Sequence, residues 1–173
     1  VEVRKSAIQH VKFIAEDLRS EYEKLLKDDS YVITENALRK LCMQFPDKAA
    51  DYLEATKGIN GYRGNNVKIT WLEMAAMTDD KYKNELVEHV SISHEFLTRD
   101  NAMGALKRLN YFNQQLLENL LDAAFNPNRR LARPAKQTIK YFKKQNQYHK
   151  QIVDYLKNGK WNEREQNIVN QLL

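Results

Sequence analysis

The sequence predicts an all-α fold, an α-α superhelix of about five antiparallel helix pairs, and three observations support this prediction. Glycine and proline are scarce, at 5 and 3 of 173 residues, and strong helix formers are common. Apolar residues recur at helical spacing along the chain. The same pattern also returns with a period of about 34 residues, which is typical of a helical repeat.

The repeat is visible as columns of residues that keep a common offset. The first helices of the pairs contribute three columns: Leu38, Leu72, Leu106 and Ile139; Leu41, Ala75, Leu109 and Phe142; Ala37, Trp71, Ala105 and Thr138. The second helices contribute Tyr52, Leu86, Leu120 and Val153. Four columns in one register are hard to obtain by chance, so we expect residues 1–173 to form a single repeat domain.

The first two pairs are predicted from residues 1–56. Residues 1–15 and 18–27 form a divergent terminal pair, as is common at the end of a repeat array. Ser30 begins the next pair, and its hydroxyl is a candidate N-cap. Pro46 ends the first helix of this pair and suits the first turn of the second. Cys42 lies on the apolar stripe, so we expect a buried structural thiol.

The remaining helices follow a loop at residues 57–66, which holds three of the five glycines. Apolar stripes mark helices within residues 67–77, 81–91, 96–109, 116–124, 131–142, 152–156 and 162–173. Asn65 or Asn66 is expected to cap the first of them, and Trp71 and Met74 to lie in the core. Pro134 is tolerated near a helix start, which predicts that its helix begins at about residues 131–133.

The sequence contains no complete catalytic or metal-binding motif. His94 begins the string HEFLT, in which Thr98 stands where a helix-borne zinc site needs its second histidine. We therefore expect a turn and a helix start there, and solvated histidines at all four histidine positions. No catalytic, cofactor-binding or metal-binding residue is assigned. No apolar run reaches transmembrane length, so no membrane partner is expected.

The C-terminal third is strongly basic. Residues 129–173 contain eleven Lys or Arg and three Asp or Glu, a local charge of +8 within a total of +5, which leaves −3 for the rest. Arg129, Arg130 and Arg133 surround a helix start and are the candidate contacts for an anion or a peptide carboxylate. Solvated helix faces are the simpler interpretation, and a nucleic-acid footprint is another.

Four strings resemble a known family: KDDSYV at 27–32, ALRKL at 37–41, TRDNA at 98–102 and NPNRRLA at 126–132. They are similar to the HEAT-like helical region at the C-terminal end of zinc aminopeptidases of the aminopeptidase N family. The resemblance implies a HEAT-like, non-catalytic domain of a longer chain, an expectation that fits the helix-like start at Val1 without an initiator methionine.

The function implied by this resemblance is that of a scaffold and possible wall of a substrate chamber. Its partners would be the catalytic domain of the same parent chain and the parent's peptide substrate. The parent would remove N-terminal residues from peptides, with zinc in the catalytic domain and no cofactor in these 173 residues. Two alternatives remain open: a HEAT-like nucleic-acid-binding protein and a free-standing protein-interaction scaffold.

Overall fold

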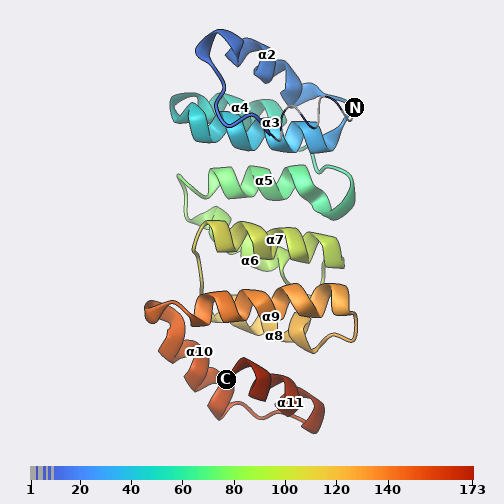
Figure 1. The fold of residues 1–173 in the computed structure, drawn as a ribbon, viewed down its shortest axis with the longest axis vertical. Helices are drawn as coiled ribbons and strands as arrows, with labels where there is room; N and C mark the ends of the chain where they lie inside the picture. The colour runs from blue at the N-terminus through green and yellow to red at the C-terminus, as the bar shows by residue number, and fades with distance from the viewer. Residues whose placement is uncertain (1–2, 4–5, 7, 9) are drawn as a thin grey trace. The chain divides into compact units, whose positions relative to one another are not determined.

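The computed structural model describes residues 3, 6, 8 and 10–173, and every regular element in this part of the chain is helical (Figure 1). The all-α prediction is therefore confirmed. The chain divides into two compact units, Val1–Glu85 and Leu86–Leu173. Each unit has a buried apolar core of its own elements.

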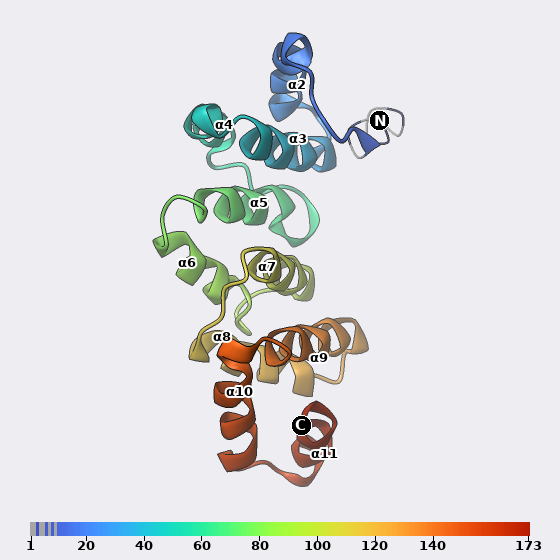
Figure 2. The same ribbon diagram turned by 60° about the vertical axis from the view of Figure 1, so that its left-hand side comes forward.

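The N-terminal unit is built around α3. Its elements are η1 (Glu16–Leu18), α2 (Arg19–Lys24), η2 (Leu25–Lys27), α3 (Tyr31–Gln44), η3 (Pro46–Lys48), α4 (Ala49–Thr56), η4 (Arg63–Asn65), α5 (Asn66–Ala75) and the first part of α6 (Lys81–His89). Helix α3 packs against α2, α4 and α5, and it lies beside α5 in two views (Figure 1 and Figure 2). Ile33, Leu38 and Leu41 of α3 are fully buried in this core.

The first predicted helix differs from the structure in its second half. Val3, Ser6, Ile8 and His10 are helical, whereas residues 11–15 are not. The remainder of that prediction lies outside the described residues. The predicted helix at 18–27 is present as the short run η1, α2 and η2.

The predicted loop at 57–66 is confirmed except at its end, where residues 63–65 form η4 and Asn66 begins α5. Its glycines have a conformational reason. Gly58, Gly61 and Gly64 all have positive φ, at 80°, 94° and 71°. At Gly61 a Cβ would also come within 2.9 Å of the backbone nitrogen of Val67. The loop therefore needs glycine both for its backbone angles and for close passage past the start of α5.

Trp71 joins three parts of the N-terminal unit. Its Nε1 donates a hydrogen bond to the carbonyl of Leu53 in α4 at 2.7 Å. Its ring meets the Tyr82 ring edge to face, with centroids 5.3 Å apart. Met74 is buried as expected, whereas Trp71 is only half-buried.

The C-terminal unit contains the rest of α6, then α7 (Phe96–Arg108), α8 (Gln114–Phe125), α9 (Arg129–Lys143), α10 (Asn146–Asn158) and α11 (Glu163–Leu172). Helix α9 packs against α7, α8, α10 and α11. Its Phe142 is fully buried among the rings of Phe112, Tyr141 and Tyr148. Helix α9 is thus the central element of this unit.

Trp161 fixes the connection between α10 and α11. Its ring contacts Phe125 edge to face and lies near Tyr155, and its Nε1 donates to the carbonyl of Leu156 at 2.9 Å. A Cβ at Gly159 would meet this ring at 2.2 Å. Glycine is therefore required at position 159 for the indole to lie against the backbone.

Asparagine side chains cap three of the helices, whereas the Ser30 side chain caps none. Asn113, Asn128 and Asn162 accept backbone N–H groups of the helices that they precede, and Asn162 forms a capping box with Glu165. Ser30 occupies the N-cap position of α3 but makes no side-chain cap. The carboxylate of Asp28 accepts from the Ser30 N–H at 2.9 Å, which is an Asx turn before the helix.

The predicted columns are mostly buried. All members of the four columns are buried except Trp71, Leu109 and Val153, which are half-buried. The column residues therefore pack inward in both units, each within its own core.

Candidate anion-binding surface on α9

Helix α9 begins earlier than the sequence suggested. The side chain of Asn126 accepts from the Asn128 N–H at 2.9 Å, and that of Asn128 accepts from the Arg130 N–H at 3.0 Å. These two bonds start the helix at Arg129 instead of at residues 131–133. Pro134 consequently lies in the second turn, where its missing N–H leaves the carbonyl four residues earlier without its usual helical donor.

Four cations of α9 share one narrow face. At about 100° per residue, Arg129, Arg133, Lys136 and Lys140 fall within about 60° of arc. The buried side chains of α9, which include Leu131 and Ile139, point to other directions of the helix. We call these four cations the basic row.

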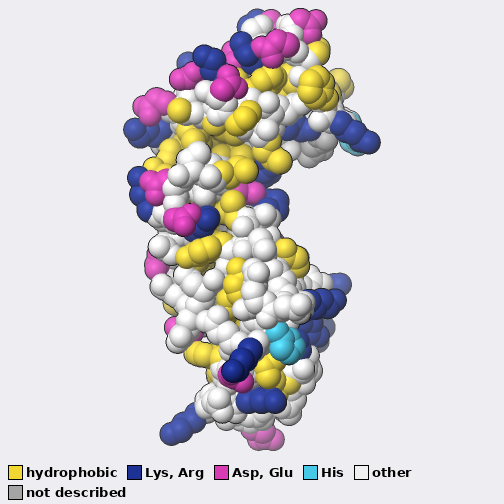
Figure 3. Space-filling model, turned by 90° about the vertical axis from the view of Figure 1, so that its left-hand side faces the viewer, with side chains coloured by type: hydrophobic (Ala, Val, Ile, Leu, Met, Phe, Trp, Pro, Cys, Tyr) yellow, Lys and Arg dark blue, Asp and Glu magenta, His cyan; other side chains and the backbone are white. Residues whose placement is uncertain are grey.

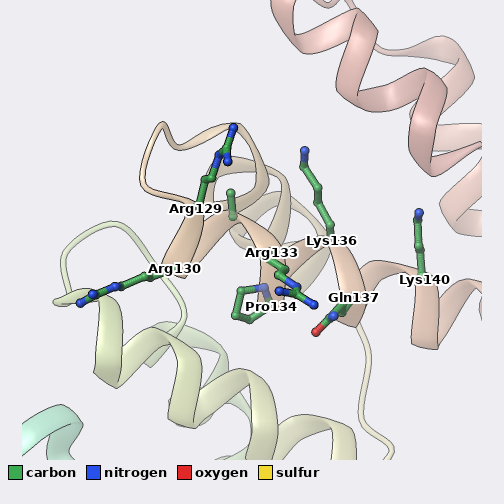
Figure 4. A pocket seen from close by; sticks show the side chains of 8 residues that line it. Arg129, Arg130, Arg133, Pro134, Lys136, Gln137 and Lys140 are labelled. Carbon is green, nitrogen blue, oxygen red and sulfur yellow. The ribbon is translucent and has the colours of Figure 1, made fainter.

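The close view shows how the side chains of α9 are directed (Figure 4). Arg129, Lys136 and Lys140 extend the same way from the helix, while Arg133 lies beside Pro134 and Gln137. The side chain of Arg130 points away from these residues. Arg129, Arg133 and the two lysines thus lie on one face of the helix, and the Arg130 side chain is directed away from them.

An open hollow of about 780 Å³ lies along this face. It is lined by Arg129, Arg130, Ala132, Arg133, Pro134, Lys136, Gln137 and Lys140. The lining combines five cations with one amide and two small apolar side chains. Such a surface suits an elongated ligand that carries several negative charges and has a backbone to hydrogen-bond.

The five cations have no carboxylate partner among the described residues, and all but the half-buried Lys136 are exposed. Lys143 differs, because its Nζ donates to the terminal backbone carbonyls of Leu172 and Leu173. On the face shown in Figure 3, carboxylates gather mostly over the N-terminal unit, where they alternate with basic side chains. The charge of α9 is therefore left for solvent or for an anionic partner.

Helix α7 occupies the neighbouring side of α9. The Nζ of Lys107 lies 5.4 Å from the centroid of the Tyr141 ring, and the Tyr141 hydroxyl donates to the Lys107 carbonyl at 3.3 Å. Asp100 of the same helix is half-buried, and burial raises the pKa of its carboxyl, an effect partly offset by the charge of Lys107. These contacts cover the Tyr141 side of α9, away from the basic row.

Sequence reasoning assigned the three arginines but left Lys136 and Lys140 outside the site. Their spacing from Arg133, three and seven residues, was the available signal, because residues three, four and seven apart share a helix face. Pro134 and Gln137 carry no charge, so no pattern of cations could have assigned them to the site. They join the lining because they flank the row on the same helix.

The HEFLT string forms the expected turn and helix start. Helix α7 begins at Phe96, and the buried Thr98 hydroxyl donates to the Glu95 carboxylate at 3.2 Å. No group of three or more His, Cys, Asp and Glu side chains suited to a metal ion occurs in the part of the chain that the structure describes.

The histidine expectation was wrong at His89 and only partly right at His94, which is half-buried. His10 and His149 are exposed, whereas His89 is only 5% exposed and stacks on the His94 ring with centroids 4.6 Å apart. The two histidines are five residues apart and would diverge on one helix. The turn after α6 brings them together, which helical spacing could not reveal.

The buried thiol was expected and is confirmed. Cys42 is 6% exposed, and burial raises its pKa to about 12. A thiol with such a pKa is almost wholly protonated at neutral pH, and the thiolate is the reactive form. Cys42 therefore acts as a packing residue.

Among the described residues, no helix combines the length and the apolar character needed to cross a membrane.

Comparison of the chain with protein-family models, with curated proteins and with solved structures gave no significant match.

Proposed function

We propose that the chain is a HEAT-like, non-catalytic C-terminal module of a zinc aminopeptidase of the aminopeptidase N family. In this proposal the module serves as a scaffold and as a wall of the substrate chamber. Its α9 surface attracts the carboxylate end of the peptide whose N-terminal residues the parent enzyme removes. Zinc belongs to the catalytic domain of the parent chain.

The repeat part of the proposal is supported by the burial of one column. Leu38, Leu72, Leu106 and Ile139, spaced 34, 34 and 33 residues apart, are all fully buried on α3, α5, α7 and α9. Stacked helical repeats need such positions, because each pair can cover its apolar stripe only against its neighbours.

The family part is supported by where the resembling strings lie. KDDSYV leads into α3, TRDNA lies in the first turns of α7, and NPNRRLA spans the start of α9. Three of the four strings therefore occupy equivalent points, at or near the start of the first helix of a pair. Strings that matched by chance would have no reason to share this location.

The basic row is the single observation that carries the peptide role. Guanidinium groups bind carboxylates through two parallel hydrogen bonds, and Arg129 and Arg133 are free of carboxylate partners among the described residues. A peptide held by its carboxylate at this surface would leave its amino end free. That is the end on which an aminopeptidase acts.

The parent activity is tested by the reading frame that encodes the chain. We expect His-Glu-x-x-His followed by a downstream glutamate, encoded before Val1. A reading frame without this motif would overturn the proposal. The purified 173-residue chain should also hydrolyse no aminoacyl-arylamide, even with added zinc, and zinc-dependent turnover would contradict its non-catalytic role.

The carboxylate role is tested with two peptides that differ only in having a free or an amidated C-terminus. We expect the free carboxylate to bind the chain several-fold more tightly in a fluorescence anisotropy titration. The preference should disappear in the variant Arg129→Gln/Arg133→Gln. It should persist in the control variant Lys150→Gln/Lys157→Gln, whose exposed lysines lie on α10.

A second candidate is a nucleic-acid-binding protein, which the same partner-free cations favour. Each phosphate that a cation neutralises releases counterions, so duplex binding would weaken with salt. The double-logarithmic slope for the four cations of the basic row would be about −3 to −4. No duplex binding at low salt would exclude this candidate.

A further inference from the structure

The basic row continues past the two arginines, so a ligand that fills it must carry more than one negative charge. Arg129 and Lys140 are eleven residues apart, which at 1.5 Å per residue is about 16 Å along the helix. A single carboxylate occupies at most the two arginines, Arg129 and Arg133. The remaining cations, Lys136 and Lys140, line the same hollow without a carboxylate partner among the described residues.

The spacing of the row is somewhat shorter than the side-chain spacing of an extended peptide, by an amount that flexible side chains can span. Successive members of the row are separated by about 6, 4.5 and 6 Å along the helix axis. Alternate side chains of an extended strand lie on one side at about 6.6 Å intervals. A peptide with acidic side chains at alternate positions before its C-terminus would therefore present its charges at nearly the interval of the cations.

The chemistry of each end of the row suggests the direction of binding. The two arginines can grip the terminal carboxylate in the bidentate manner, whereas lysines act as point charges on flexible stems. Gln137 lies beside the row and offers both a donor and an acceptor to a peptide backbone. The lysine end is thus suited to acidic side chains that precede the carboxylate.

The lining argues against single-stranded nucleic acid as the occupant. Proteins that bind such strands combine cations with aromatic side chains on which bases stack. None of the eight residues that line the hollow is aromatic.

We infer that the basic row selects extended peptides with acidic side chains at alternate positions before a free C-terminal carboxylate. This inference rests on the proposed function and deepens it, because it names a substrate class for the same surface. Lys136 and Lys140 are then specificity residues, and the arginines hold the carboxylate that all peptide substrates share.

The test uses the 173-residue chain and four fluorescent hexapeptides in anisotropy titrations. The first has glutamates at alternate positions, and the second has the same composition with its glutamates in one block. The third carries glutamines in place of the glutamates, and the fourth is the first with an amidated C-terminus. We expect the first to bind most tightly and the third to lose about 3- to 20-fold in affinity.

The lysines are tested with Lys136→Gln/Lys140→Gln and with the control Lys150→Gln/Lys157→Gln, which makes the same charge change on α10. The first variant should weaken binding of the alternating peptide about 3- to 20-fold and leave the glutamine peptide within about twofold. The control should leave both within about twofold. Thermal melting of both variants checks that these surface changes preserve the fold.

The two proposals fail in different ways. Equal binding of the glutamate and glutamine peptides would overturn this inference, and a retained preference for the free carboxylate would leave the proposed function standing. Equal binding of the alternating and blocked peptides would overturn the extended register. Loss of both preferences together with tight duplex binding would overturn both proposals in favour of a nucleic acid.

Discussion

The two units use the same sequence interval for different interactions. In the N-terminal unit, Arg39 of α3 donates to the carboxylate of Glu73 in α5, 34 residues later, at 3.0 Å. In the C-terminal unit, Lys107 of α7 lies against the ring of Tyr141 in α9, also 34 residues later. The first contact is an ion pair, and the second is a cation–π contact.

The N-terminal pair belongs to a network. Arg39 also donates to Thr70 at 2.8 Å and approaches Glu35 at 3.4 Å, and Glu35 accepts from the Asn66 amide at 2.8 Å. Glu73 is only 3% exposed. Charge in this unit is therefore neutralised inside the contact between α3 and α5.

The difference shows how one type of helix contact can serve two purposes. Where the later helix supplies a carboxylate, the cation holds two helices together. Where it supplies a tyrosine, the cation packs on the ring, and the buried ion pair of this unit lies elsewhere, between Arg99 and Asp122. The cations of the basic row on α9 have no carboxylate partner among the described residues, so they remain available to a ligand.

The largest expected effect comes from Arg99, the buried cation of the C-terminal unit. Its side chain is 3% exposed, and it donates to the Val90 carbonyl at 2.8 Å and to the Asp122 carboxylate of α8 at 2.6 Å. Arg99→Met leaves these acceptors unpaired and should lower the free energy of unfolding by about 3 kcal/mol. Urea denaturation measures the change. The control Arg130→Met should stay within about 0.5 kcal/mol, because Arg130 is exposed.

The next effect tests the ion pair of the N-terminal unit. Glu73→Gln removes a buried carboxylate that is bonded to Arg39 and should cost about 2 kcal/mol, since Arg39 keeps Thr70 and Glu35. The matched control is Glu54→Gln, which breaks the exposed pair with Lys57 and should cost less than about 1 kcal/mol. Equal costs for the two variants would remove the basis of the comparison between the units.

A smaller effect is expected from the cation–π contact. Lys107→Met should lower the free energy of unfolding by about 0.5–1 kcal/mol through loss of the attraction to the Tyr141 ring. Lys150→Met serves as the control in the same denaturation series. A cost as large as that of Glu73→Gln would mean that both units depend equally on charge at this interval.

The smallest effect concerns Asp100, whose pKa is raised by burial. Folding therefore favours its protonated form, and wild-type stability falls as the pH rises through the folded-state pKa. Asp100→Asn lacks this loss, so we expect its stability to fall less than that of the wild type as the pH rises to 7, measured by urea denaturation. The difference should vanish below about pH 3, where the wild-type carboxyl is largely protonated in both states. A constant difference between pH 3 and pH 7 would contradict this cause.

Local sequence signals predicted most of the helices. The predictions failed where the position or burial of a side chain depends on residues outside its own helix. The repeated spacing of Leu38, Leu72 and Leu106 correctly indicated buried helix positions, because burial leaves a helical period in sequence. Ser30 stands at the predicted N-cap position, but its hydroxyl makes no cap; the N–H groups of Ile33 and Thr34 donate to the Ser30 backbone carbonyl. His89 was misread because the turn that stacks it on His94 is not encoded in helical spacing.

The candidate site was predicted in part for a similar reason. Composition pointed to the arginines at the start of α9, but it could not show which cations lack carboxylate partners. That depends on contacts with other elements, as Lys143 demonstrates through its bonds to the end of the chain. The start of α9 was also misplaced, because Pro134 was assumed to lie in the first turn.

The two tryptophans offer a spectroscopic consequence of the fold. The chain has only two, Trp71 and Trp161, and the boundary after Glu85 leaves one in each unit. Both indoles donate to a backbone carbonyl and contact another aromatic ring, so their fluorescence should change when the surrounding helices separate. The single-tryptophan variants Trp71→Phe and Trp161→Phe would therefore report the melting of each half separately. Coincident denaturation curves would identify one cooperative folding unit, and displaced curves would identify two.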